Sequence, residues 1–269
     1  MFLEAFEGNP LLNPQKNNGA LLLENLNMNQ SKEASPFQDA LENGVFADAS
    51  KILLMRGDLK GKLVLDLACG DGRTTYLLRK MGAIVSPFDI IPEYYKLDDR
   101  ARFADVQQRL PIPDESADLV ILQEVIEHLP NQLFALQEIY RVLKPGGELF
   151  ITTPSRSSLE ARLSYLFFES ENLKACPWGS VDGIWGRDTA GNGKYYGHLW
   201  LIGMQQLKAL GGIAGFKSIE IKRTKISKAS VVLMFIFYPF IFLVSIRALY
   251  RDMKKHGDNL DYRTKYLKE

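Results

Sequence analysis

Net charge and cysteine are both scarce in this chain. Its 269 residues hold 33 Lys and Arg against 32 Asp and Glu, so the formal net charge is only +1. Protein surfaces that bind nucleic acid over an extended area normally carry an excess of basic residues. The low net charge therefore argues against a nucleic-acid partner. The two cysteines, Cys69 and Cys176, are too few for a disulfide framework or a cysteine-based metal cluster.

A secretory signal and internal repeats are also missing. The N-terminus lacks the order of basic and then apolar residues that marks a signal peptide, so we expect a cytoplasmic protein. We divide the sequence into an N-terminal extension (1–45), a main domain (46–225) with an insertion (156–196), and an apolar C-terminal segment (226–269). A chain of this length can bury a large core within one such domain.

What the chain does contain is a strand-turn-helix motif at residues 63–75. An apolar run leads into Asp66, and a Gly-x-Gly turn follows at Gly70 and Gly72 before a segment with a helical pattern. Because glycine lacks a Cβ atom, the backbone N–H groups of such a turn can approach a ligand closely. In open α/β sheets, nucleotide-like ligands bind at turns on the carboxyl ends of parallel strands.

Four further apolar runs follow that motif and predict strands. They cover residues 83–89, 102–106, 118–123 and 148–154. A carboxylate at Asp89 can accept both hydroxyls of a ribose, and one at Asp105 can accept an exocyclic adenine amino group. The third run is apolar enough for a strand buried on both faces.

In this order, the motifs resemble those of class I S-adenosylmethionine-dependent methyltransferases, in the group that includes ubiquinone and menaquinone methyltransferases. The matching segments are residues 66–72, 88–93, 110–114, 127–130 and 143–147, with a weaker match at 197–216. The resemblance implies an α/β fold with a doubly wound, mostly parallel seven-stranded Rossmann-like sheet, to which this sequence adds an inserted segment and a hydrophobic C-terminal segment. It also implies an enzyme that uses S-adenosyl-L-methionine as its cofactor.

A nicotinamide dinucleotide is the rival ligand for this turn. Its fingerprint is Gly-x-Gly-x-x-Gly, and here Thr75 stands at the third glycine position. The turn also carries Asp71, which would repel a pyrophosphate. S-adenosylmethionine has no phosphate and is cationic at its sulfonium, so the acidic turn favours the methyl donor.

The predicted cofactor site lies between the strand that opens the motif at residue 63 and the strand at residues 118–123. Its residues are Asp66, Ala68, Gly70, Gly72, Asp89, Ile90, Asp105, Val106 and Gln123. We expect Asp66 to order the turn and the methionine end of the cofactor. Asp89 would bind the ribose and Asp105 the adenine, while Gln123 would line the methionyl side. The two glycines would make room for the ligand.

Methyl transfer needs a nucleophile held in line with the S–CH3 bond, and an oxygen nucleophile must also lose a proton. Histidine suits that task because its ordinary pKa is near neutrality. His128 follows Glu127 just after the strand at 118–123, and His198 opens the weaker match. We predict His128 and His198 as candidate catalytic bases, although a structural role stays open for both. His256 lies in a charged tail and is expected to be solvated.

Glu124, Glu127 and His128 could together recruit a divalent cation. Three polar groups without a fourth ligand do not define a metal centre, and we predict none.

Helical patterns occupy three segments outside the motif. A helix at residues 36–56 could be a lid over the cofactor or a cap on the sheet. The link between Asp89 and Asp105 is short for a full crossover helix, so we expect a stubby helix or an irregular connection. The third helix is predicted at residues 159–168.

Aromatic residues cluster in the glycine-rich remainder of the insertion. They are Trp178, Trp185, Tyr195 and Tyr196. Loops at the carboxyl ends of strands carry specificity in open α/β folds, so these side chains could wrap a sugar or an isoprenoid group. They could equally pack the insertion onto the sheet.

The C-terminal segment has no charged residue from 229 to 246, and Pro239 lies in its middle. Basic residues flank it on both sides: Lys222, Arg223, Lys225 and Lys228 before it, and Arg247, Arg251, Lys254 and Lys255 after it. A shallow helical hairpin or an interfacial helix in membrane contact would suit this pattern. The alternatives are a buried strand at 231–237 followed by a helix, and a true membrane span.

We therefore predict a methyltransferase that O-methylates a small or lipid-linked acceptor, such as a saccharide or a quinone-like molecule. Its location would be cytoplasmic, at the inner face of a membrane if the C-terminal segment contacts lipid. The alternative is a non-catalytic S-adenosylmethionine-binding module in a glycan assembly pathway. The sequence predicts no oligomeric state.

Overall fold

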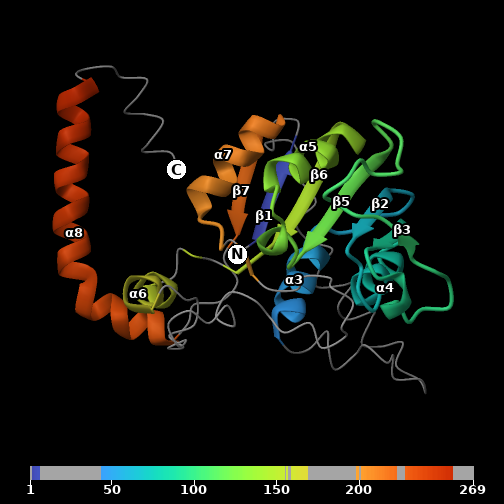
Figure 1. Cartoon of the computed structure of the whole chain (residues 1–269), viewed down its shortest axis with the longest axis horizontal. Coiled ribbons are helices and arrows are strands. Elements are labelled where there is room, and N and C mark those ends of the chain that lie inside the picture. The colour runs from blue at the N-terminus through green and yellow to red at the C-terminus, as the bar shows by residue number, and fades with distance from the viewer. Residues whose placement is uncertain are drawn as a thin grey trace.

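A computed structural model describes residues 2–6, 44–154, 156, 159–168, 198–199, 201–222 and 228–256. In this part of the chain, seven strands form one sheet. In chain order they are β1 (Phe2–Phe6), β2 (Leu63–Leu67), β3 (Ile84–Asp89), β4 (Arg102–Phe103), β5 (Ala117–Gln123), β6 (Leu143–Thr152) and β7 (Ser218–Lys222). Their order across the sheet is β4-β3-β2-β5-β6-β1-β7 (Figure 1).

All of these strands except β1 point in one direction. The strands β4, β3, β2, β5 and β6 pair in parallel. Strand β1 is antiparallel to both β6 and β7, so β7 runs the same way as the parallel five. This arrangement confirms the predicted α/β class and the mostly parallel sheet. It also gathers the carboxyl ends of six strands on one edge.

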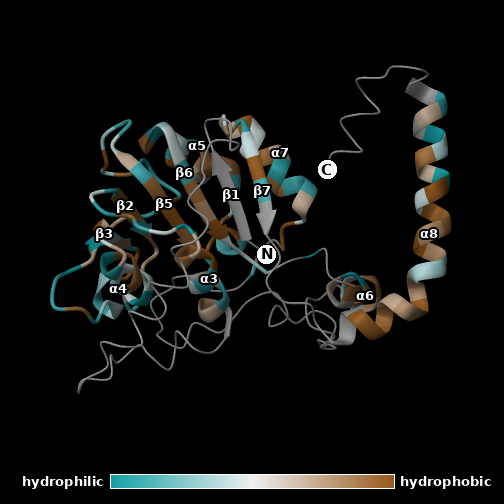
Figure 2. Ribbon diagram, turned by 180° about the vertical axis from the view of Figure 1, so that it is seen from behind, coloured by the Kyte–Doolittle hydropathy of each residue, from teal (hydrophilic) through white to brown (hydrophobic). Residues whose placement is uncertain are grey.

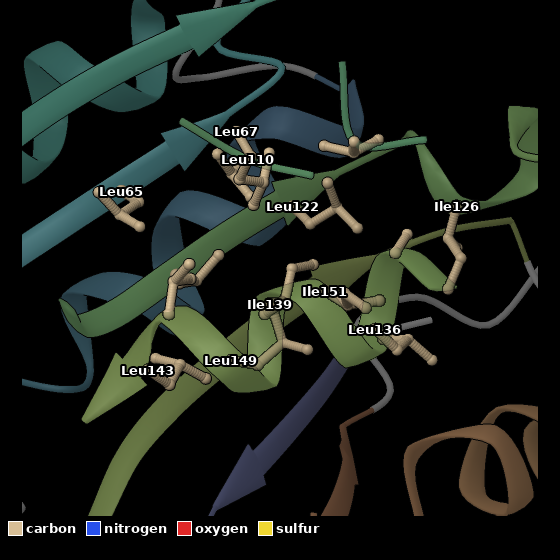
Figure 3. Packing of buried hydrophobic residues seen from close by; sticks show 14 of the residues in the cluster. Leu65, Leu67, Leu110, Leu122, Ile126, Leu136, Ile139, Leu143, Leu149 and Ile151 are labelled. Carbon is tan, nitrogen blue, oxygen red and sulfur yellow. The ribbon is translucent and has the colours of Figure 1, made fainter. Parts of the chain in front are cut away.

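Helices cover both faces of the sheet. They are α3 (Gly44–Leu54) and α4 (Arg73–Lys80) on one face, and α5 (Gln132–Val142) and α7 (Met204–Ala214) on the other. Successive side chains of a strand point to opposite faces. Accordingly, Val64 of β2 packs with the α3 and α4 side, whereas Leu65 packs with the α5 and α7 side. Figure 3 shows the second cluster, where Leu136 and Ile139 of α5 lie over Ile151 of β6.

The antiparallel strand comes from the start of the chain. Phe2 pairs with Thr152 of β6 on one side and with Lys222 of β7 on the other. The first residues of the predicted N-terminal extension thus belong to the sheet, while residues 7–43 lie outside the described part. The alternative prediction of a last strand at 231–237 is wrong, because those residues are helical and β1 occupies the position between β6 and β7.

The predicted connecting elements can be compared with the structure one by one. Helix α3 falls inside the predicted helix, of which residues 36–43 are not described. The short link contains only a 3₁₀ turn, η2 (Pro92–Tyr94), as expected. Helix α6 (Leu159–Phe168) has the predicted bounds. The aromatic cluster from Trp178 to Tyr196 lies outside the described residues.

Beyond the sheet, the chain forms one long helix, α8 (Lys228–His256), which has Pro239 inside it. It contacts α6 and bends into two limbs, the second of which runs well away from the sheet (Figure 1). Proline removes a backbone donor and clashes with the preceding turn, which accounts for a bend in this helix. Its stretch Val231–Arg251 has a mean hydropathy of 2.2 and is long enough to cross a membrane.

Candidate functional site

The turn after β2 has the backbone conformation that close approach to a ligand requires. Ala68, Gly70 and Gly72 have φ angles of 60°, 52° and 93°. For Ala68 this left-handed conformation is unusual and marks a constrained position. The Cys69 N–H donates to the Phe88 carbonyl (3.0 Å), which ties the turn to the end of β3.

Asp89 at the end of β3 holds the same turn. Its Oδ2 accepts a hydrogen bond from the Gly70 N–H (2.8 Å), and its Oδ1 accepts one from the Ile91 N–H (2.8 Å). Asp89, which the sequence predicts to bind the ribose, therefore also orders the glycine turn. Each carboxylate oxygen has a second lone pair, so capacity for ribose hydroxyls remains.

Asp66 is buried at the end of β2, beneath the turn. Its Oδ2 accepts a hydrogen bond from the Thr75 hydroxyl (2.6 Å), which connects β2 to the first turn of α4. Burial raises the pKa of Asp66 to about 7; the Thr75 hydrogen bond opposes this shift, and the nearby charge of Asp89 adds to it. The carboxyl group thus lies close to its ionisation midpoint at neutral pH.

An open cleft of about 440 Å³ lies in front of these groups. It is lined by Phe46, Asp66, Ala68, Cys69, Gly70, Asp71, Arg73, Thr74, Glu93, Tyr94, Lys96 and Gln123. Pockets for small ligands typically begin at about 300 Å³, so the cleft is large enough for part or all of a nucleoside-sized ligand. Three carboxyl groups (Asp66, Asp71 and Glu93) and two basic side chains (Arg73 and Lys96) line it, and this small acidic excess is compatible with a ligand that carries positive charge.

The structure brings together only some of the predicted cofactor residues. Asp66, Ala68, Gly70 and Gln123 line the cleft, and the Thr74 hydroxyl hydrogen-bonds to Gln123 Oε1. The other five predicted residues do not line it: Gly72, Asp89, Ile90, Asp105 and Val106.

Local geometry explains several of these differences. A Cβ atom on Gly72 would meet the Tyr95 ring at 2.8 Å, so this glycine makes room for Tyr95 rather than for a ligand. Asp105 accepts hydrogen bonds from the Gln107 N–H (2.8 Å) and from Gln108 Nε2 (3.2 Å). Val106 is buried in the core.

Sequence reasoning missed the far wall of the cleft. Glu93, Tyr94 and Lys96 come from the short link after β3, whose length was noted but whose position was not predicted. Arg79 of α4 anchors this link by donating to both oxygens of Asp99, at 2.9 and 2.7 Å. A basic residue and an acidic residue twenty positions apart are a weak signal, and only the fold brings them into contact.

Helix α3 reaches the cleft at one end. Phe46 lines the opening, and the Arg73 guanidinium lies over its ring at 5.0 Å. Arg73 also binds Asp71 of the turn at 2.7 Å. Farther along the same helix, Leu53 is completely buried against the sheet. The helix therefore covers the sheet and borders the cleft at one end, and a role as a lid stays a prediction.

A second polar cluster lies just beyond β5, in the 3₁₀ turn η3 (Ile126–His128). The rings of His128 and His198 meet edge to face with centroids 4.8 Å apart. The Leu199 N–H donates to the Glu127 carbonyl (2.9 Å) and so holds the later segment against this turn. The two predicted catalytic histidines are thus neighbours, although the sequence separates them widely.

Glu127 is the buried member of this cluster. Its Oε2 accepts a hydrogen bond from the Thr153 hydroxyl (2.9 Å), while its Oε1 has no hydrogen-bond partner among the described residues. Burial raises the pKa of Glu127 to about 7, and the charge of Glu124 adds to this shift. One ligand atom from each of Glu127, His128 and His198 lies within 4.8 Å of the others.

The 3.9 Å between Glu127 Oε1 and His128 Nε2 is too long for a hydrogen bond, but the three groups could hold one cation between them. The set differs from the one considered in the sequence, because His198 takes the place of Glu124. Glu124 instead accepts a hydrogen bond from the Thr152 hydroxyl at 2.7 Å.

The chain is similar to known methyl-transferring proteins over its central part. Residues 65–151 match the family model described as a methyltransferase domain. The mitochondrial ubiquinone biosynthesis O-methyltransferase of Rattus norvegicus is 36% identical over 124 residues, which cover 41% of this chain and 36% of that protein. The ubiquinone biosynthesis O-methyltransferase of Xanthomonas oryzae pv. oryzae (strain PXO99A) is 33% identical over 112 residues, covering 38% and 47%.

A third relative is described more broadly. The probable S-adenosylmethionine-dependent methyltransferase of Mycolicibacterium smegmatis is 37% identical over 102 residues, covering 36% of this chain and 39% of that protein. The chain therefore spans less than half the length of each of these three relatives.

Proposed function

We propose that this chain, whose residues 65–151 match a methyltransferase domain, is a class I S-adenosylmethionine-dependent enzyme that transfers a methyl group to an oxygen atom of a small or lipid-linked acceptor. The observation that carries this proposal is the cleft at the glycine turn after β2, together with the cluster of the buried Glu127 and the partly buried His128 and His198 beyond β5. One feature serves a cationic cofactor and the other a hydroxyl acceptor.

The cofactor fits the charge of the cleft. When bound, S-adenosylmethionine supplies an activated methyl group on a sulfonium. Asp66 lies in the wall of the cleft and would balance this positive charge. The amide of Gln123 would border the methionyl side, because its Oε1 is fixed by the Thr74 hydroxyl. Asp89 would hold the ribose from the end of β3.

Asp105 would bind the adenine at the end of β4. Ile90, at 38% exposure, would offer it an apolar contact, and the buried Val106 would support that wall from behind. A Cβ atom on Gly70 would point into open space, with no heavy atom within 4 Å of it. Because glycine has no Cβ atom, this space would be free for the ligand.

The acceptor would bind next to His128 and His198. An acceptor hydroxyl must lose its proton as the oxygen attacks, and a neutral imidazole can take it. Glu127 Oε1 lies 3.9 Å from His128 Nε2 and would stabilise the resulting imidazolium. In this arrangement the protein contributes position and proton transfer, because the sulfonium is already a good leaving group.

Two observations support a choice of acceptor class. Ubiquinone precursors are the substrates that the names of two relatives indicate, and the exposed apolar helix α8 would bring the site to lipid. A polyprenyl-linked saccharide or a quinone-like acceptor is therefore our proposal, with the enzyme at the cytoplasmic face of a membrane. A small acceptor in free solution is the simpler alternative.

Calorimetry with S-adenosylmethionine and S-adenosylhomocysteine tests the cofactor site. Asp89→Asn should weaken binding at least tenfold, because it removes one of the two charged oxygens that hold the turn and the ribose. Asp98→Asn is the matched control, since Asp98 is exposed in the neighbouring link, whereas Asp89 accepts the hydrogen bond from the Gly70 N–H that holds the glycine turn. Equal binding by both variants would refute the assignment.

Transfer of a labelled methyl group into a lipid extract tests the reaction. His128→Ala and His198→Ala should lower the rate by about 100-fold or more, as expected for loss of a general base, and should leave cofactor binding intact. His256→Ala, in the last turn of α8, should retain full activity. Cofactor binding without transfer to any extract or soluble fraction would instead favour a non-catalytic binding module.

A further inference from the structure

Helix α8 exposes apolar side chains around its whole circumference. Five consecutive residues, from Phe240 to Val244, are between 39% and 68% exposed. Because successive helix residues are about 100° apart, five of them cover every direction around the axis. An interfacial helix would need a polar face, and α8 has none along this stretch. Figure 2 shows this apolar helix standing apart from the sheet.

From these observations we propose that α8 inserts into the hydrocarbon layer of a lipid bilayer. The stretch Val231–Arg251 contains 21 residues, which span about 31 Å at 1.5 Å per residue, and the hydrocarbon layer is about 30 Å thick. Pro239 is compatible with insertion, since prolines are tolerated in helices within membranes.

The charges at the ends of the helix fit anionic lipid headgroups. Lys228 begins α8 and an uncharged run follows at 229–246; Arg247, Arg251 and Lys254 come after this run, the first two still within the stretch Val231–Arg251, whereas the first acidic residue of the helix is Asp252. Basic residues near a membrane surface are attracted to anionic lipids by about 1 kcal/mol each. The helix therefore pairs an uncharged centre with cationic ends.

A second copy of the chain would cover α8 less completely. A helix pair buries one face of each helix and leaves the remaining faces in water. Here residues in all directions are apolar, so a dimer would still expose most of them. A bilayer covers the full circumference, and we choose it for this reason.

Helix α8 contributes no strand to the sheet, so its binding to lipid would not disturb the strand order. Strand β1 already occupies the position between β6 and β7. The main contacts of α8 with another described element are with α6, where Leu166 and Phe167 are 72% and 68% exposed. Helix α6 follows β6 and Thr153, whose hydroxyl bonds to Glu127.

Flotation with phospholipid vesicles tests insertion without reference to methyl transfer. The full chain is synthesised by cell-free translation in the presence of phosphatidylcholine vesicles, with or without phosphatidylglycerol. The wild-type chain should float with both and should remain bound in high salt and alkaline carbonate. Phosphatidylglycerol should increase the bound fraction at low salt.

Two matched substitutions localise the contact. Leu243 of α8 and Ile213 of α7 are each 65% exposed. Leu243→Lys should lower the ratio of bound to free protein roughly 100-fold, because lysine at the centre of a membrane helix is strongly disfavoured. Ile213→Lys should float like the wild type. Both variants should bind S-adenosylmethionine normally, which shows that the body is folded.

Three results would overturn the proposal. They are failure of the wild type to float, equal flotation of Leu243→Lys, and release of the wild type by salt alone. A dimer that Leu243→Lys disrupts, without vesicle binding, would identify a second copy as the occupant. The inference deepens the proposed function by naming its lipid-contacting surface, but normal cofactor binding combined with failed flotation would refute only this inference.

Discussion

Ionisation of Asp66 should couple cofactor binding to pH. Burial holds the pKa of this carboxyl group at about 7, and the group lies in the wall of the cleft. A cationic ligand favours the ionised form, so binding should release a proton from those molecules in which Asp66 is protonated. Affinity for S-adenosylmethionine should therefore rise as the pH increases through 7.

The size of the effect follows from the titration. About one in ten free molecules has an ionised Asp66 at pH 6, and about nine in ten at pH 8, so the apparent Kd should fall roughly tenfold between them. In Asp66→Asn this tenfold change of Kd between pH 6 and pH 8 should vanish. The Asn side-chain oxygen can still accept the hydrogen bond from the Thr75 hydroxyl. Calorimetry in buffers of different ionisation enthalpy measures both Kd and the number of protons released.

The Asn variant also serves as the control for titration of the ligand itself. Because both proteins bind the same ligand, the difference in how their apparent Kd changes with pH is due to Asp66. Parallel slopes in the two proteins, or no proton release by the wild type at pH 6, would refute the reasoning.

The same group should affect stability. The unfolded carboxyl group ionises near its ordinary pKa of 3.8, whereas the folded one keeps its proton up to about pH 7. The free energy of unfolding should therefore fall as the pH rises across this window, by at most about 4 kcal/mol, and Asp66→Asn should flatten that decline in urea titrations.

Three further substitutions test the construction of the site. Gly72→Ala should destabilise the fold by about 1–2 kcal/mol through its left-handed backbone, and it should weaken cofactor binding by displacing Tyr95; normal binding would contradict the role of that contact. Phe46→Ala should weaken cofactor binding without altering the urea midpoint, if α3 borders the ligand. Leu136→Ala should cost about 2–5 kcal/mol in urea unfolding, because the side chain is buried at 1% exposure.

The sequence was most informative where the signal is local. Short apolar runs and the turn at Gly70 predicted β2, β3 and β5 within a residue or two, because apolar runs and glycine conformations are properties of short segments. The bounds of α6 followed from helical spacing for the same reason. The cleft-facing residues Asp66 and Gln123 could be predicted because they stand at the ends of strands.

Long-range pairing could not be predicted in the same way. Nothing in residues 2–6 distinguishes a strand from other short apolar segments, and their place depends on β6 and β7. The contact of His198 with His128 depends on the backbone hydrogen bond between Leu199 and Glu127, which no local pattern encodes. The far wall of the cleft likewise depends on the Arg79 and Asp99 contact.

The location of β1 has a consequence for how this protein is made. Phe6 is paired with Ser218, so β1 leaves the ribosome long before β7 and lacks this neighbour until β7 has been synthesised. Contacts this distant along the chain slow folding and leave an open strand edge in the meantime. Helix α8 emerges soon after β7. Closure of the sheet and delivery of the helix to lipid would then coincide, late in translation.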